Sequence, residues 1–239
     1  FNCQKTGMET LDISMFPLGG TFYNSPGSFW ASDCSYLQKI LLKDSSYYVN
    51  IFVVNDCSLN GVLDIPIKYL YNEFLAYGNR NLTGIKFKSS SDNTYQVQRF
   101  RVNDCSLSGT LDISMFRGFG TISTTDYSGE FDFSNNRNLT NILFPTSPNH
   151  LRNLYINNCN LTGEVDLSGL YGLGMNIPQG MYFYAYGNPN LTSLKLPTSP
   201  YSISNFNCAS CNLTGILDVS GLTGLGATQG NFIVNYNRN

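Results

Sequence analysis

One phrase returns four times along this chain, each time with a cysteine, a leucine, a glycine and an aspartate in the same order. It reads "NDCSLNGVLDIP" from Asn55, "NDCSLSGTLDIS" from Asn103, "NNCNLTGEVDLSGL" from Asn157 and "ASCNLTGILDVS" from Ala209. With Asp12 as a fifth member, the aspartates recur every 48 to 54 residues. A fixed period of this size is typical of architectures in which each unit packs only against its neighbours. The period therefore predicts a solenoid, and the length of 239 residues by itself decides little about domain number.

A second phrase alternates with the first. It reads "AYGNRNLTGIKF" from Ala76, "FSNNRNLTNILFP" from Phe133 and "AYGNPNLTSLKLP" from Ala185. The long repeat thus consists of two half-repeats of about 22 to 31 residues, close to the length of one solenoid coil. We expect residues 1–239 to form a single solenoid of about ten coils. Because the sequence begins and ends inside a half-repeat, we also expect it to be an internal piece of a longer protein.

The half-repeats share one pattern of apolar positions. In "LRNLYINNCNL", residues 151–161, the spacing fits L-x-x-L-x-L-x-x-N/C-x-L, and on this motif the chain resembles the leucine-rich-repeat family along nearly its whole length. The resemblance implies a right-handed stack of coils with short parallel strands. The inward pairs expected from two-residue alternation are Phe52/Val54, Phe74/Ala76, Phe100/Val102, Phe131/Phe133, Leu154/Ile156, Phe183/Ala185, Phe206/Cys208 and Phe232/Val234. Phe often replaces Leu, and glycine-rich stretches such as "YGLGMNIPQG" replace regular helices, so the fold is expected to be β-rich with loop-rich returns and few helices.

A column of Cys and Asn residues follows these strands. After Thr6 it reads Cys34, Cys57, Asn79, Cys105, Asn136, Cys159, Asn188, Cys211 and Asn237. The family resemblance implies that this column turns inward and satisfies backbone groups at the bend, as a structural ladder.

A second short strand is expected after the column, in "LDIS", "LDIP" and "VDLS" of one half-repeat and "IKF", "ILFP" and "LKLP" of the other. Its outward residue runs Asp64, Lys86, Asp112, Leu143, Asp166, Lys195 and Asp218. With coils about 4.8 Å apart, these residues are expected to make cross-strand pairs that fix register.

The cysteines invite a disulfide or metal interpretation. Cys57, Cys105, Cys159 and Cys211 fall on every second coil, about 10 Å apart at a rise of about 4.8 Å, which is too far for disulfides among them. Cys34 and Cys57 occupy adjacent coils and could form a bridge, although two buried thiols are the favoured alternative. The pair "CASC", Cys208 and Cys211, fits core and ladder positions better than a zinc or redox site, because no second pair exists. We therefore predict no metal and no cofactor.

Catalysis has little support in the sequence. The single histidine, His150, has no identifiable nucleophile or orienting partner, and the aspartates recur with the coil as scaffold residues do. The five N-x-T sequons, at Asn81, Asn138, Asn160, Asn190 and Asn212, surround leucines that the repeat buries and are interpreted as by-products. The chain is therefore not expected to be an enzyme.

The outward rows of the first strand are the best place to look for function, because leucine-rich repeats usually bind through this surface. Acidic and basic rows alternate first, with Glu73, Arg99, Arg101, Glu130 and Asp132, and later rows carry no charge. The candidate ligand-binding residues are Asn153, Tyr155, Asn157, Tyr182, Tyr184 and Tyr186. Tyrosine offers both ring area and a hydroxyl and is favoured at recognition hot spots, although it is also simply a good strand former.

Composition narrows the class of function. Only 13% of residues are charged, and the 14 Lys and Arg are scattered, which argues against nucleic-acid binding. No apolar run is long enough to cross a membrane, and no signal peptide is recognisable. We expect a non-enzymatic segment of a large extracellular, cell-surface or virion-surface protein that binds a protein or glycan in adhesion or recognition. The alternative is a structural spacer or assembly element of a surface filament or fibre, which stacks with identical chains and has no free ligand.

Overall fold

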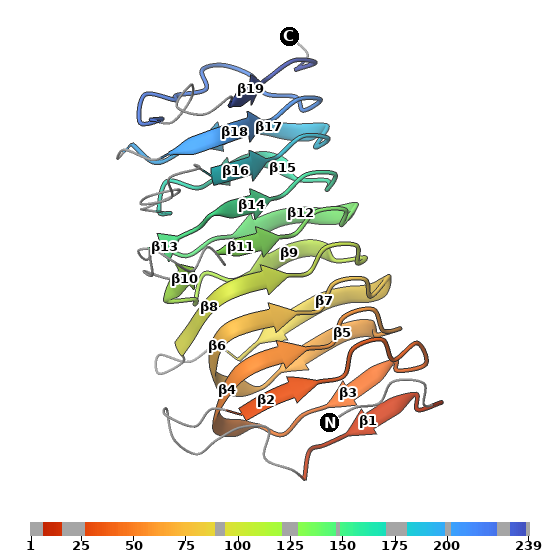
Figure 1. The fold of residues 1–239 in the computed structure, drawn as a ribbon. Coiled ribbons are helices and arrows are strands. Elements are labelled where there is room, and N and C mark those ends of the chain that lie inside the picture. Colours follow the sequence, from red (N-terminus) through yellow and green to blue (C-terminus); the bar gives the residue numbers. More distant parts are fainter. Residues whose placement is uncertain are drawn as a thin grey trace.

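The computed structural model confirms a parallel β-solenoid (Figure 1). It describes residues 7–15, 27–88, 94–120, 129–146, 149–170, 181–198, 202–223 and 230–237, and within these the side chains of 45–47, 94, 118–120 and 149–150 are not described. These residues contain nineteen strands and no helix. The loop predicted at "YGLGMNIPQG", Thr6 and the side chain of His150 lie outside the described residues and side chains.

One long sheet runs through the whole stack. Its strands are, in spatial order, β2 (Gly27–Trp30), β4 (Ser45–Val53), β6 (Ile67–Leu75), β8 (Thr94–Arg101), β11 (Glu130–Asp132), β14 (Asn153–Tyr155), β16 (Met181–Tyr184), β18 (Ile203–Asn207) and β19 (Asn231–Ile233). Each neighbour pair is parallel, and β10 (Gly118–Gly120) and β13 (Asn149–His150) extend the sheet beside this path. We call this the main sheet. Successive coils therefore place equivalent residues side by side.

The second set of strands lies across the core from the main sheet (Figure 1). It comprises β1 (Thr10–Asp12), β3 (Lys39–Leu41), β5 (Asn60–Ile65), β7 (Asn81–Phe87), β9 (Ser108–Asp112), β12 (Asn138–Leu143), β15 (Thr162–Asp166) and β17 (Asn190–Lys195), joined as four separate parallel pairs. Asp64 lies beside Lys86, and Asp166 beside Lys195, so the predicted register is confirmed. Lys195 Nζ is 2.9 Å from Asp166 Oδ2, an exposed ion pair that solvent screens and that adds little to stability.

A column of aromatic rings fills the core between the two sets of strands. Phe29, Phe52, Phe74 and Phe100 stack at centroid distances of 5.0, 5.5 and 5.2 Å, and all are almost fully buried. Offset ring pairs contribute about 0.5–1.5 kcal/mol each beyond their buried area. In the last described coil, Phe232 still stacks on Phe206 at 5.0 Å but is 41% exposed.

The Asn members of the inward column join each coil to the one before it. Asn136 Nδ2 donates to the Val102 carbonyl of the preceding coil at 2.9 Å and to Phe133 at 2.8 Å, while its Oδ1 accepts the Leu107 N–H at 3.0 Å. The same three bonds recur at Asn79, Asn188 and Asn237. The Cys members only donate: the thiols of Cys57, Cys105, Cys159 and Cys211 donate to a carbonyl of the preceding coil. Each Cys coil thus depends on the following Asn to accept its leucine N–H, which explains why the two alternate.

The residue before each column member has a left-handed backbone. These residues are Asp33, Asp56, Gly78, Asp104, Asn135, Asn158, Gly187, Ser210 and Tyr236, with φ between 52° and 73°. Asp, Asn and Gly tolerate this conformation best, and they occupy most of the row. At Gly78 a Cβ would lie 2.3 Å from Asp56 Oδ1, so a larger residue there would require the Asp56 side chain to move.

Four of the recurring aspartates form a local hydrogen bond that ends the second strand. Oδ1 of Asp12, Asp112, Asp166 and Asp218 accepts the backbone N–H of the serine two residues later, at 2.9, 2.9, 2.8 and 2.9 Å. Such Asx turns end the second strand and redirect the chain. Hydrogen bonds from the Ser14 hydroxyl and N–H lower the pKa of Asp12, and those from the Ser220 N–H and hydroxyl lower the pKa of Asp218. Four of the five repeated aspartates are therefore turn residues, whereas Asp64 is followed two residues later by Pro66, which has no N–H to donate.

Neither alternative considered for Cys34 is correct. Cys34 is disulfide-bonded, whereas Cys57 is a free thiol, so the two are not joined to each other and are not both thiols. The reason is geometric: the Cys57 thiol turns to the Ala31 carbonyl, 2.9 Å away. Cys208 and Cys211 are free and buried, one in the core and one in the column.

Candidate functional site

The outer face of the main sheet presents one row of side chains per coil, because alternate strand residues point away from the core. Strand register aligns the rows into columns. The first column runs Glu73, Arg99, Glu130, Asn153, Tyr182, Asn205 and Asn231, and the second runs Leu75, Arg101, Asp132, Tyr155, Tyr184, Asn207 and Ile233. The predicted candidate residues therefore lie on adjacent coils of one surface.

The rows on β6, β8 and β11 are charged and paired among themselves. Arg99 Nη1 lies 2.7 Å from Glu73 Oε1. The Arg101 side chain lies 3.7 Å from Glu130 and 4.0 Å from Asp132, and its guanidinium covers the Tyr77 ring at 4.6 Å. Each of these charged side chains therefore has a partner of opposite charge on the same face of the sheet.

Asp132 is the most buried charge of this face, with 7% of its surface exposed. Its Oδ1 accepts the Ser134 N–H at 3.0 Å and the Ser134 hydroxyl at 2.6 Å. Burial raises the pKa of Asp132, and the bonds from Ser134 and the nearby Arg101 oppose this shift without cancelling it. The Asp132 carboxylate thus makes its hydrogen bonds within the fold.

The rows on β14 and β16 bring four tyrosines together, and we call Tyr155, Tyr182, Tyr184 and Tyr186 the tyrosine cluster. Tyr184 lies at its centre, with ring centroids 5.4 Å from Tyr155, 6.2 Å from Tyr182 and 6.1 Å from Tyr186. All four are half-buried. Among the described residues, their hydroxyl groups have no hydrogen-bond partner. The core residue Tyr95 differs, because its hydroxyl donates to the Ile67 carbonyl at 2.7 Å.

The hydroxyls of Tyr155 and Tyr184 stay protonated at neutral pH. Burial raises the pKa of Tyr155, with Glu130 as a further cause, and burial raises that of Tyr184, with Tyr182 and Tyr186 contributing. Each of these two hydroxyls can therefore both donate and accept a hydrogen bond.

Amide side chains border the cluster on the neighbouring coils. Asn153 and Asn205 flank Tyr182, and Asn207 lies beside Tyr184. Asn207 Oδ1 accepts the Ala209 N–H at 3.0 Å, which leaves the Asn207 amino group facing outward without a partner among the described residues. Asn153 Oδ1 is buried with no hydrogen-bond partner there. Asn157 is only 6% exposed, so of the six candidate residues it offers the least surface.

Two features lie outside the candidate residues predicted from the sequence. The repeat pattern places Asn207 in an outward row but not among the candidates, and strand register sets it next to Tyr184. A second aromatic group lies near the start of the long strands: Tyr48 and Tyr69 stack at 4.2 Å, and Lys68 Nζ is 5.1 Å from the Tyr69 ring centroid. Its rings are already partnered by one another.

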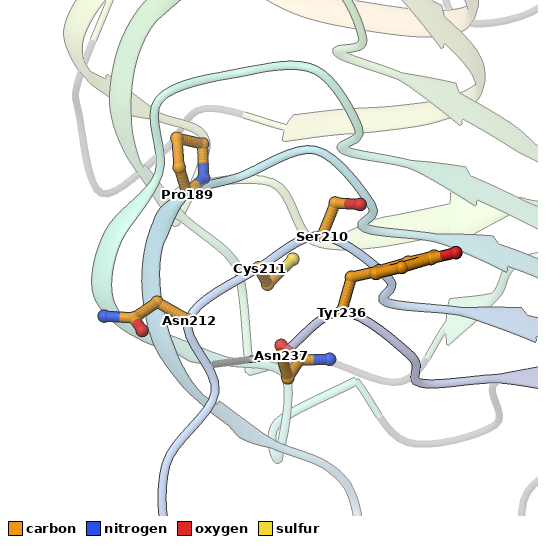
Figure 2. Close-up of a pocket in the computed structure, with 6 residues that line it drawn as sticks. All are labelled: Pro189, Ser210, Cys211, Asn212, Tyr236 and Asn237. Carbon is orange, nitrogen blue, oxygen red and sulfur yellow. The ribbon is translucent and has the colours of Figure 1, made fainter. Parts of the chain in front are cut away.

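The structure contains two surface hollows of note. One, of about 600 Å³, is lined by Pro189, Ser210, Cys211, Asn212, Tyr236 and Asn237 (Figure 2). Its Cys211 and Asn237 are bonded to the preceding coil, and burial raises the pKa of the Cys211 thiol. The other, of about 440 Å³, lies between β12 and β15. In the second hollow the Ser168 hydroxyl donates to Asp166 Oδ1 at 2.5 Å, a contact that belongs to the turn after β15, and no histidine is among the described residues that line either hollow.

Metal and membrane features were also sought. In the described part of the chain, no three His, Cys, Asp or Glu side chains are grouped as metal ligands. Within the same ranges, no helix has the length and apolar character of a membrane span. The backbone of His150 belongs to β13, while its side chain lies outside the described groups.

Comparison with known proteins adds no relative. No family model, no curated protein and no solved structure matches this chain.

Proposed function

We propose that this chain is a leucine-rich-repeat-like, non-enzymatic recognition segment of a large extracellular or particle-surface protein. It binds a ligand on another cell or particle through the outer face of the main sheet around β14, β16 and β18. The tyrosine cluster carries this proposal, because four adjacent rings there keep hydroxyl groups with no partner in the described structure. Tyrosines with both ring area and a free polar group are enriched at binding hot spots.

The solenoid architecture supports the same function. Stacked coils present an extended surface whose shape is set by the inward residues, so the outward side chains are free to contact a ligand. The five described free thiols are buried and unreactive, which fits an exported protein despite its unpaired cysteines. Low charge and abundant Asn, Ser, Thr and Tyr also suit an exposed surface.

The test is binding of the fluorescently labelled chain to a panel of cells and particles by flow cytometry. The variant Tyr182→Ser/Tyr184→Ser/Tyr186→Ser is expected to lose at least about tenfold in affinity, since hot-spot truncations cost about 2 kcal/mol or more. The matched control is Tyr36→Ser, which removes a 60% exposed tyrosine far along the stack and should leave binding unchanged. Circular dichroism and urea unfolding establish that each variant folds. Should the triple variant be unstable, Tyr182→Ser/Tyr186→Ser serves in its place.

The alternative, a structural spacer or assembly element, draws on a different observation. Hydrogen bonds from the Asn and Cys column link successive coils along the described stack, which gives rigidity without a ligand. A folded chain that binds no cell or particle, and that associates with itself equally with or without the three tyrosines in analytical ultracentrifugation, would favour this alternative.

A further inference from the structure

The chemistry of the main-sheet face also indicates the class of ligand, and this step rests on the proposed function. The four rows on β14, β16, β18 and β19 contain no charged side chain. In the charged rows before them, Arg99 and Arg101 already have acidic partners. Glu130 and Asp132, beside Tyr155, already face Arg101. A charged ligand placed on the rings of β16 would therefore lose water without gaining an opposite charge from these rows, which is unfavourable. The ligand expected there is uncharged.

The unbonded polar groups exclude a purely apolar ligand as well. Covering the cluster with an apolar chain would bury phenol hydroxyls and the Asn207 amino group without partners, which is unfavourable for each group. A ligand rich in hydroxyl groups avoids this cost, because every hydroxyl can donate and accept. It also needs apolar faces to lie on the half-buried rings.

The geometry fits a ligand made of repeated units. The ring centres of Tyr182, Tyr184 and Tyr186 follow one another along one coil at 6.2 and 6.1 Å, and Tyr155 adds a ring at 5.4 Å on the coil before. The rings are tilted by 42° to 61° to one another rather than stacked face to face, so no ring of the cluster is covered by another ring lying parallel to it. Pyranose units have apolar C–H faces and a rim of hydroxyls, and a chain of them would meet successive rings.

We propose that the tyrosine cluster, with Asn207 beside it, binds an uncharged oligosaccharide. The rings contact the C–H faces of the sugars, and the phenol hydroxyls and the Asn207 amino group bond to the sugar hydroxyls. The second aromatic group differs, because Tyr48 and Tyr69 lie face to face with an interplanar angle of 6° and stack on each other.

The experiment uses a glycan array and calorimetry with defined probes. The probes are cello-, xylo-, manno- and galacto-oligosaccharides of increasing length, with sialylated and sulfated glycans beside them. We expect one or more neutral series to bind, with affinity that rises with length over the first few units and is insensitive to salt. The triple Tyr→Ser variant should lose at least about tenfold, Tyr184→Phe and Asn207→Ala should each lose about three- to tenfold, and Tyr36→Ser should lose nothing.

Three results would overturn the glycan proposal: binding confined to charged glycans and abolished by salt, neutral-glycan binding that survives in the triple variant, or no glycan binding by the folded chain. The cell-binding experiment separates this failure from failure of the proposed function. Cell binding that needs the tyrosines but is removed by protease treatment of the cells would replace the glycan by a protein ligand while recognition stands. Absence of both cell and glycan binding would remove the recognition function itself.

Discussion

The outer face of the main sheet has two halves that share a scaffold and differ in what they leave unbonded. On β6, β8 and β11 the outward rows are acidic and basic and pair across strands, as in Glu73 with Arg99. On β14, β16 and β18 the rows are tyrosine and asparagine, and the tyrosine hydroxyls have no partners among the described residues. Both halves bury phenylalanine at the same inward position. We call them the charged half and the tyrosine half.

The difference teaches that this repeat separates positions that fold the chain from positions open to function. The inward residues and the Asn/Cys column repeat almost unchanged through both halves, whereas the outward rows change their chemistry completely. In the charged half the acidic and basic side chains pair with one another, and Arg101 covers the Tyr77 ring, so fewer groups face a ligand. In the tyrosine half, the tyrosine hydroxyls have no hydrogen-bond partner among the described residues and are available to a ligand.

The strongest test of the shared scaffold is removal of one column amide in each half. Asn79→Ala and Asn188→Ala each delete three matched bonds, with distances of 2.8 to 3.1 Å in both, and leave a buried leucine N–H unsatisfied. Each should lower the free energy of unfolding by about 3 kcal/mol, measured by urea denaturation. The exposed Asn81→Ala is the control and should change stability by less than about 0.5 kcal/mol. Costs for the two buried sites that differ by more than about 1 kcal/mol would show that the halves do not share one scaffold.

Thiol reactivity compares the same column without a mutation. Cys105 in the charged half and Cys159 in the tyrosine half each donate to a carbonyl of the preceding coil at 3.3 Å. Burial raises the pKa of each thiol to about 12. Alkylation by iodoacetamide, followed by mass spectrometry, should be at least about a hundredfold slower in the native chain than in guanidinium at both sites. Rapid labelling of Cys159 alone would mean that the tyrosine half opens locally.

Asp132 lies at the boundary between the halves and gives a pH-dependent test. Burial raises its folded pKa, so its contribution to stability is present below the unfolded pKa and is lost as pH rises through the folded pKa. Asp132→Asn keeps an oxygen that can accept from Ser134 but cannot ionise. The free energy of unfolding of the variant, relative to the parent, should therefore increase as pH rises from acid toward neutral, by less than the effect of losing a column amide. Urea unfolding across this pH range measures it, and a relative stability that falls with pH would mean that Arg101 outweighs burial.

The sequence predicted the scaffold better than the surface. Two-residue alternation at Phe74 and Ala76, and the recurrence of Asp64 beside Lys86, were enough for strand faces and register, because period and packing determine both. The pairing of Cys34 could not be predicted, since neighbouring positions in a column do not determine where a sulfur atom points.

Surface properties depend on details that a pattern does not contain. Alternation placed Asn157 outward, yet the bend before the column buries it. Whether the Tyr184 hydroxyl has a partner depends on atoms contributed by other coils. The turn role of Asp166 depends on a serine two residues later, a local signal that was present in the sequence and that the period obscured.

The smallest effect on stability is expected at the ion pair between Glu73 and Arg99 in the charged half. Glu73 and Arg99 are partly exposed, with 22% and 37% of their side-chain surfaces accessible, so solvent screens their 2.7 Å contact. Glu73→Gln should lower the free energy of unfolding by at most about 1 kcal/mol at low salt, and high salt should reduce the difference further. The same variant should bind neutral oligosaccharides and target cells as the parent does, because Glu73 and Arg99 lie outside the tyrosine cluster. Urea unfolding at two salt concentrations and the binding assays measure both. A loss of binding in Glu73→Gln with intact folding would extend the functional surface into the charged half and end the division between the two.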